Sequence, residues 1–112
     1  MSSNMINFPY NSLGVARMDE YGIIHNHLYH ECPVGRVDTD NIVHNHHVNY
    51  SPIGRVDKDG IIHKHISDNY PIGRVDNNGF VYDNKNNPIA RVEGDDIYKS
   101  GGGFLLLIND IR

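Results

Sequence analysis

The sequence is poor in the residues that mark several common classes of protein. It has one cysteine, Cys32, and no tryptophan among 112 residues. A single cysteine excludes an intramolecular disulfide framework and a cysteine-rich zinc site, and it favours a reducing, cytoplasmic location. Basic residues are few as well, because 10 Lys and Arg stand against 14 Asp and Glu, which gives a net charge of -4. We therefore expect no groove for nucleic acid, which would require a basic face.

Long apolar segments and catalytic motifs are also missing. The apolar run 104–108 is far shorter than the about 20 residues that span a bilayer, and residues 1–5 lack the features of a signal peptide. We therefore expect no association with membranes. There is no Gly-x-Ser-x-Gly motif and no phosphate-binding loop. An enzyme is the least supported class of function, and no catalytic residue is assigned.

What the sequence does contain is an internal repeat. Segment 53–65 matches segment 34–46, nineteen residues earlier, and segment 72–81, nineteen residues later. Two less similar copies, one at each end, bring the number of copies to five, with approximate bounds 14–34, 35–53, 54–72, 73–89 and 90–108. Because 112 residues are too few for a second core, residues 1–112 are predicted to form a single domain whose core is shared by all copies.

Each copy is predicted to be a β-hairpin. β-Branched residues flank a turn such as Asp-Lys-Asp-Gly, whose last residue, Gly60 in the third copy and Asn41 in the second, tolerates a left-handed conformation. A proline, at position 33, 52, 71 or 88, can begin the strand without a backbone donor. The hairpins are expected to bury the valines at 37, 56, 75 and 92 against one another.

The predicted fold is all-β, with five tandem hairpins arranged around an axis and no helix longer than a turn. Residues 97–98 are expected to be the second strand of the fifth copy, and the pattern breaks at the glycines 101–103. Segments 5–8 and 104–108 are the apolar pieces outside the repeat. We expect both to be strands that cover the ends of the array, either by pairing with each other to close a ring or by pairing with a second copy in a homo-oligomer.

The order of glycine, arginine, aliphatic residue and aspartate, then Asp-Gly, aliphatic residues and a return to Ile-Gly, resembles the five-fold β-flower repeat proteins over residues 14–108. The resemblance implies hairpins arranged like petals around an axis, and it implies no established activity. The sequence departs from the family pattern in the histidines of the second strand and in the triple glycine.

Six histidines form a His-x-His ladder in three consecutive copies: His25, His27, His44, His46, His63 and His65. Alternate side chains of a strand share a face about 7 Å apart, so each pair could converge on zinc or another divalent transition metal. The alternative is a polar outward position that was duplicated with the repeat, since the fourth and fifth copies lack these histidines.

Five arginines also occupy one repeat position, with an acidic residue two positions later: Arg17, Arg36, Arg55, Arg74 and Arg91. One interpretation is a belt of ion pairs between these arginines and the acids. The other is a pocket for a small anionic ligand such as phosphate, a nucleotide or an acidic sugar, which requires the arginines to point to the axis. The sequence thus favours a non-catalytic binding module, with metal, anion and a purely structural homo-oligomer as open alternatives.

Overall fold

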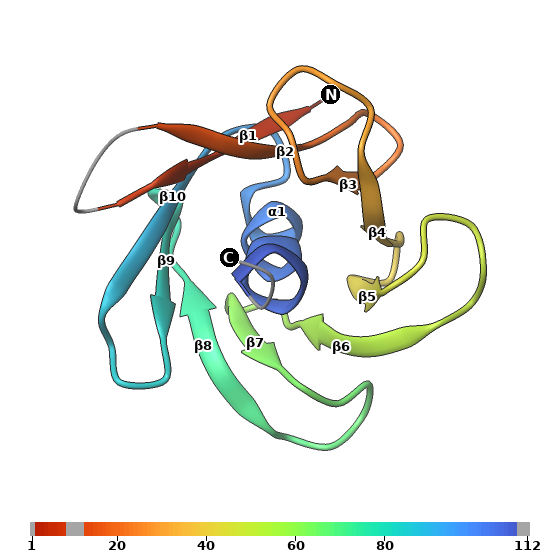
Figure 1. The fold of residues 1–112 in the computed structure, drawn as a ribbon. Helices are drawn as coiled ribbons and strands as arrows, with labels where there is room; N and C mark the ends of the chain where they lie inside the picture. Colours follow the sequence, from red (N-terminus) through yellow and green to blue (C-terminus); the bar gives the residue numbers. More distant parts are fainter. Residues whose placement is uncertain (1, 9–12, 110–112) are drawn as a thin grey trace.

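The chain folds into a closed barrel of antiparallel strands around a central helix (Figure 1). This computed structural model describes residues 2–8 and 13–109. Along the chain, the strands are β1 (Ser3–Asn7), β2 (Gly14–Met18), β3 (Ile23–His25), β4 (Pro33–Val37), β5 (Ile42–His44), β6 (Pro52–Val56), β7 (Ile61–His63), β8 (Pro71–Val75), β9 (Phe80–Asp83) and β10 (Pro88–Gly94). Neighbours in sequence are neighbours in the barrel, and β1 closes it between β2 and β10. The predicted ring of hairpins and the prolines at the strand starts are confirmed.

The turns follow the predicted chemistry. In the third hairpin the N–H of Gly60 donates to the carbonyl of Asp57, and Gly60 has φ 85°. Asn41 takes the same left-handed conformation in the second hairpin, with φ 65°. The carbonyl of Gly60 also accepts the N–H of Val75 in the next hairpin. The turn residue therefore joins neighbouring copies, and the prediction of positive φ at Gly60 is confirmed.

The fifth hairpin is built from both ends of the chain. Strand β1 pairs with β10 in the register Ser3 to Gly94 through Asn7 to Ala90, and it also pairs with β2. The apolar N-terminal segment therefore closes the ring by taking the place of the second strand of the fifth copy. The predicted pairing of this segment with segment 104–108 is wrong. The prediction of a strand at Ile97 and Tyr98 is wrong, because these residues begin a helix.

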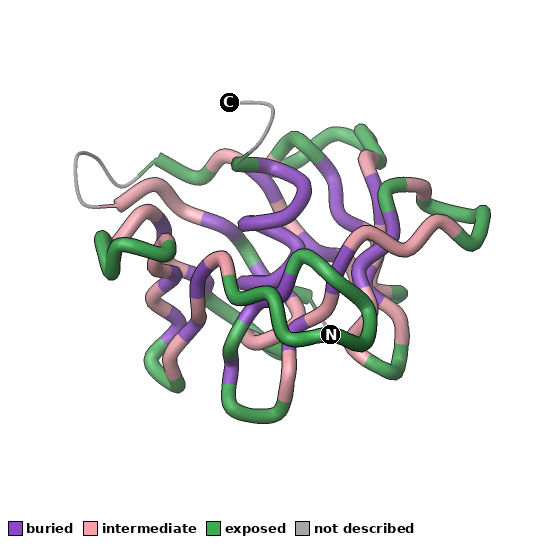
Figure 2. Tube along the Cα trace, turned by 90° about the horizontal axis from the view of Figure 1, so that it is seen from below, coloured by how far each residue is buried: buried purple, intermediate pink, exposed green. Residues whose placement is uncertain are grey.

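A helix fills the axis of the barrel. It consists of α1 (Ile97–Gly103), which continues without a break into η1 (Phe104–Ile108), a π-helical segment. The prediction that no helix exceeds a turn is wrong, and so is the prediction of a strand at 104–108. The inner face of the strands lines the barrel with short residues such as Val37, Val56 and Val75, and further apolar side chains are needed to fill its axis. The helix supplies them, and its residues 100–108 are all buried (Figures 1 and 2).

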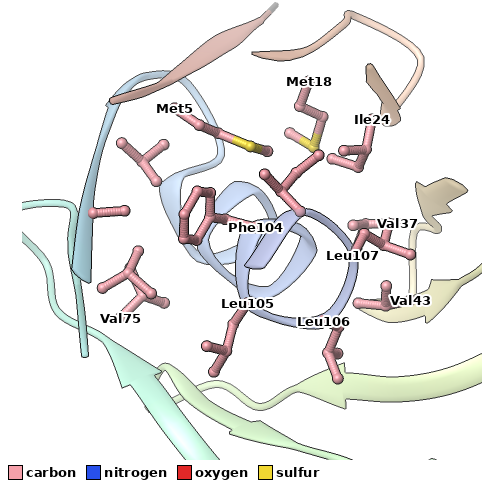
Figure 3. Packing of buried hydrophobic residues seen from close by; sticks show 14 of the residues in the cluster. Met5, Met18, Ile24, Val37, Val43, Val75, Phe104, Leu105, Leu106 and Leu107 are labelled. Carbon is pink, nitrogen blue, oxygen red and sulfur yellow. The ribbon is translucent and has the colours of Figure 1, made fainter. Parts of the chain in front are cut away.

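The helix and the barrel fit by exchanging large and small residues at two levels. At one level the helix has leucines, which point outward from it (Figure 3), and the strands have glycines. Leu105 packs on Gly73, Leu106 on Gly54 and Leu107 on Gly35. A Cβ at Gly54 would lie 2.8 Å from Cδ1 of Leu106 and would also collide with the carbonyl of His63. A side chain at Gly54 or Gly73 would therefore collide both with the helix and with the adjacent strand.

At the second level, one helical turn earlier, the sizes are reversed. Gly101 lies against Val75, Gly102 against Val56, and Gly103 against Val37 and Ile24. A Cβ at Gly101 would lie 2.7 Å from Cβ of Val75. The valines of the repeat are buried, as predicted, but their main neighbour is the glycine face of the helix. The triple glycine is thus part of the core.

Candidate functional site: the histidine-bearing loops

Three loops of similar conformation project from the barrel between successive hairpins. We call residues 26–32, 45–51 and 64–70 the petal loops (Figure 1). Each loop is closed at its base by a backbone hydrogen bond: from Asn26 to Cys32, from Asn45 to Ser51 and from Lys64 to Tyr70. The ladder histidines lie at the start of these loops. The first histidine of each pair ends a strand and the second lies in the loop, so the expectation that both share one face of a strand is wrong.

The first histidines, His25, His44 and His63, join the loop to the turn of the same hairpin. They are buried, with 1%, 0% and 4% exposure. The neighbouring residue in each strand faces the core, so these rings lie on the outer face of the barrel, beneath the loop. Nε2–H donates to Oδ2 of Asp19, Asp38 or Asp57 at 2.9, 2.8 and 3.0 Å. Nδ1 accepts the N–H of Cys32, Ser51 or Tyr70 at 3.1, 3.1 and 3.0 Å.

The aspartate partners also hold the turns. Oδ1 of Asp57 accepts the N–H groups of Asp59 and Ile61 at 2.9 and 3.0 Å. Partial burial raises the pKa of Asp57, but the hydrogen bonds from His63 and from these two N–H groups outweigh it and lower the pKa below its ordinary value. The pKa values of Asp19 and Asp38 are lowered in the same way, with burial opposed by hydrogen bonds from the histidine and the backbone.

The fourth hairpin keeps this arrangement without histidine. Tyr82 replaces the first histidine, and its hydroxyl donates to Oδ2 of Asp76 at 3.1 Å. The guanidinium of Arg74 lies 3.9 Å above the Tyr82 ring. A polar ring that donates to the aspartate therefore occupies this position in the first four hairpins, and the imidazole is one such ring. In the fifth hairpin Ile6 stands opposite Arg91 instead.

The second histidines, His27, His46 and His65, hold the interior of each petal loop. Nδ1 of His27 accepts the N–H groups of Tyr29 and His30 at 3.0 and 2.9 Å. The equivalent bonds to His46 come from residues 48 and 49, at 3.0 and 2.9 Å, and those to His65 come from residues 67 and 68, at 3.0 and 2.8 Å. Two imidazoles per loop thus accept three backbone N–H groups, and they fix the loop backbone independently of its other side chains.

These bonds bear directly on the predicted metal site. A ligating imidazole binds metal through an unprotonated nitrogen and usually donates its other N–H to a partner. In all six ladder rings Nδ1 accepts backbone N–H groups, so the neutral ring carries its proton on Nε2. Within residues 2–8 and 13–109 no group of three or more His, Cys, Asp or Glu is placed to hold a metal ion. Binding of zinc or another divalent transition metal by these rings stays a prediction, and it would require the loops to give up these bonds.

The arginines support the petal loops from the outer face of the barrel. Arg55 donates to the carbonyls of His65 and Asp68 at 2.8 and 2.9 Å and to the Asn69 side chain at 3.1 Å. Longer contacts of 3.4 Å join Arg17 to the carbonyl of His30 and Arg36 to that of Asn49. These three guanidinium groups therefore hold loop backbone.

Neither sequence interpretation of the arginines matches this geometry. In the part of the chain that the structure describes, Arg91 with Glu93 is the one ion pair between an arginine and an acid, because the aspartates of the first three copies bind histidine. The five guanidinium groups do not converge on the axis, which the helix fills (Figure 1). Anion binding by Arg17, Arg36, Arg55, Arg74 and Arg91 stays a prediction without a pocket at the axis to support it.

The sequence argument did not identify the exposed apolar side chains of the petal loops. Tyr29, Val48, Tyr50, Ile66 and Tyr70 are 80%, 68%, 73%, 39% and 59% exposed. Only Tyr29 and Val48 share a repeat position, so a search for residues that recur in every copy passes over the group. A search for positions that vary between copies, within loops whose hydrogen-bonding residues are constant, could have found them.

Comparison of the chain with protein-family models, with curated protein sequences and with solved structures gives no match. Membership of the five-fold β-flower family stays a prediction from the repeat motif. Among the residues that the structure describes, no helix is long and apolar enough to cross a membrane.

Proposed function

We propose that this chain is a non-catalytic binding module that contacts a protein partner through the three petal loops. The observation that carries the proposal is that constant and variable residues have different roles within these loops. The residues that recur in all three loops hold the backbone, and the residues that differ between the loops face solvent. Binding residues are commonly found on loops positioned by a rigid scaffold.

The composition of the loops favours a protein as the partner. Their exposed side chains are tyrosine, histidine, asparagine, serine and aliphatic residues. Tyrosine contributes a large contact area at a small cost in conformational entropy, and serine and asparagine adapt their hydrogen bonds to the partner. The charged residues of the three loops, apart from histidine, are Glu31, Lys64 and Asp68. A nearly neutral, aromatic surface fits a protein better than it fits nucleic acid, whose binding depends on phosphate contacts.

The exposure of apolar side chains on the loops supports the same conclusion. Of the eight large hydrophobic residues that are exposed in the described part of the chain, five lie in the petal loops. Each petal loop therefore presents at least one exposed apolar side chain to a partner, and the three loops follow one another around the barrel (Figure 1). Tyr50 also packs beside His44, with ring centroids 5.1 Å apart, so part of this surface is held in place by the framework.

The test uses binders selected from a random peptide display library against the immobilised protein at pH 7.5. Their affinity is then measured for a Tyr29→Ala/Tyr70→Ala variant and for a Tyr21→Ala control. Tyr21 is 78% exposed but lies in a turn, at the other end of the hairpin from the petal loops. If the loops are the binding surface, the double variant should weaken the selected binders by about tenfold or more, as expected for loss of aromatic hot spots.

The result that would overturn the proposal is equal retention of binders by the double variant and the parent, or a loss confined to Tyr21→Ala. Thermal melts of both variants show whether the fold is intact. The two other hypotheses are tested with the same protein. Sedimentation velocity at increasing concentration detects a homo-oligomer, and calorimetry with Zn²⁺ at pH 7.5 detects metal uptake by the ladder histidines.

A further inference from the structure

We infer that the petal loops are a pH switch, in which protonation of His27, His46 and His65 at Nδ1 opens the loops and releases whatever is bound to them. The opening of the loops stands on the geometry alone. The release of a partner rests on the function proposed above. Imidazole is the side chain that ordinarily changes its protonation between about pH 5 and 8.

Protonation removes the acceptor on which the loop backbone depends. We call the second histidines, which lie in the petal loops, the outer rings, and the first histidines, which end the strands, the inner histidines. Nδ1 of each outer ring faces two backbone N–H groups, and no other acceptor for these groups is present in the described loops. A proton at Nδ1 would point at two further donors, so both hydrogen bonds are lost together. The outer rings are accessible to protons, since the His65 side chain is 45% exposed. Loss of both hydrogen bonds frees the loop backbone, so acid favours the open form.

The charges around the outer rings act in the same direction in the first two loops. The ring of His27 lies against that of His30, with centroids 4.4 Å apart, and Arg17 donates to the carbonyl of His30. His46 stacks on His47 with centroids 4.9 Å apart, and Arg36 lies beneath the same loop. Within the described residues, no carboxylate lies within 4.0 Å of either outer ring. A positive charge on these rings would meet other cationic or protonatable groups.

The third loop differs because it contains an acid. Nε2 of His65 lies 3.8 Å from Oδ2 of Asp68, and Arg55 donates to the carbonyls of both residues. The carboxylate would partly stabilise a protonated His65. A carboxylate also lies at Nε2 of each inner histidine, although Nδ1 of these rings also accepts a backbone N–H. We therefore expect loops 26–32 and 45–51 to open at higher pH than loop 64–70.

The fourth hairpin provides an internal control. Its loop is held by a carboxylate in place of an imidazole: Oδ1 of Asp83 accepts the N–H groups of Lys85 and Asn87 at 2.9 and 3.0 Å. The hydrogen bond from the N–H of Asn87 is the largest cause that lowers the pKa of Asp83 below its ordinary value. This acceptor is retained across the range in which imidazoles become protonated, so the fourth loop should stay closed.

The experiment measures backbone amide exchange of the full-length protein from pH 7.5 to 5.0, corrected for the intrinsic effect of pH on exchange. The variants are His27→Asn and His46→Asn. The Asn Oδ1 is bonded to Cγ, as is His Nδ1, so it can accept the same N–H groups, as Asp83 does, but it does not take up a proton. In the parent, protection in loops 26–32 and 45–51 should fall about tenfold or more, while the loop after Tyr82 is unchanged. In each variant the substituted loop should keep its protection.

Two outcomes would overturn the switch: protection in the petal loops that is retained to pH 5.0, or a loss of protection that persists in the Asn variants. The affinity of the binders selected at pH 7.5 is measured in parallel at pH 5.5. If the loops open and the binders remain bound, the switch stands and the proposed binding surface is wrong. If the binders require Tyr29 and Tyr70 but the loops do not open, the binding surface stands and the switch is wrong.

Discussion

The fit between the helix and the barrel predicts that one substitution should change sign with its background. The substitution is Gly101→Ala, alone and together with Val75→Gly. In the parent a Cβ at Gly101 would lie 2.7 Å from Cβ and 2.8 Å from Cγ2 of Val75. Val75 is β-branched, buried and fixed in β8, so it cannot turn away without moving the strand.

The magnitude follows from two opposed effects. Alanine is more favourable than glycine inside a helix by about 1 kcal/mol. Overpacking a well-filled core costs about 1 to 3 kcal/mol, so Gly101→Ala should be neutral to destabilising by about 2 kcal/mol in the parent. In the Val75→Gly background all three atoms that the new methyl would meet, Cβ, Cγ1 and Cγ2, are gone and the methyl fills vacated space, so the same change should stabilise by about 1 kcal/mol. The coupling energy between the two sites should therefore be about 1 to 3 kcal/mol.

The free energies of unfolding of the parent, both single variants and the double variant are measured by denaturant titration. Gly102→Ala is the matched control, because its Cβ would lie 3.1 Å from Cβ of Val56, a contact that a small shift can relieve. It should couple less strongly to Val56→Gly. If Gly101→Ala has the same effect in both backgrounds, the packing of the glycine face against the valines is wrong.

Three further predictions concern the turns, the acid limb and the helix. Gly60→Val should lower stability by more than about 1 kcal/mol, since φ is 85° at this position and a β-branched residue is strained there; thermal melts check it. The lowered pKa values of Asp19, Asp38 and Asp57 contribute stability that is present above about pH 4, the unfolded value, and is lost as the pH falls through the folded values. In Asp57→Asn the free energy of unfolding should therefore fall less steeply with decreasing pH than in the parent. Deleting residues 104–112 removes the filling of the barrel and should give insoluble protein, and a soluble variant with an unchanged melting point would contradict this.

The hairpins could be predicted from the sequence because their causes are local. A glycine or asparagine at the end of the turn, a proline at the strand start and a repeated valine each act within a few residues. The repeat spacing then places the copies in order. The histidines were located by the same register, but their role was not, because their partners are backbone N–H groups that leave no mark in the sequence. The tyrosines of the petal loops lie outside any register and were missed for that reason.

The central helix could not be predicted because its cause is not local. Three consecutive glycines cost about 1 kcal/mol each in a helix relative to alanine, and five consecutive apolar residues are also typical of a buried strand. The segment is helical because the barrel leaves an axial space and because its glycines and leucines complement valines and glycines that lie far away in sequence. Only the paired positions, such as Gly101 with Val75 and Leu106 with Gly54, contain this information.

The π-helical segment follows from the same complementarity. Leu105, Leu106 and Leu107 face the fourth, third and second copies in turn, so each step along the helix must advance by one copy. Five copies around an axis are separated by about 72°, whereas an α-helix advances by about 100° per residue. A π-helix, with i→i+5 hydrogen bonds, has a wider turn and a smaller step, so its five residues come closer to one residue per copy. By this order Phe104 and Ile108 face the fifth and first copies, where the small residue of the strand is Ala90 and Ala16 instead of glycine. Deleting one leucine would displace every later residue by one copy, and it should therefore destabilise the barrel more than truncating the same leucine to alanine.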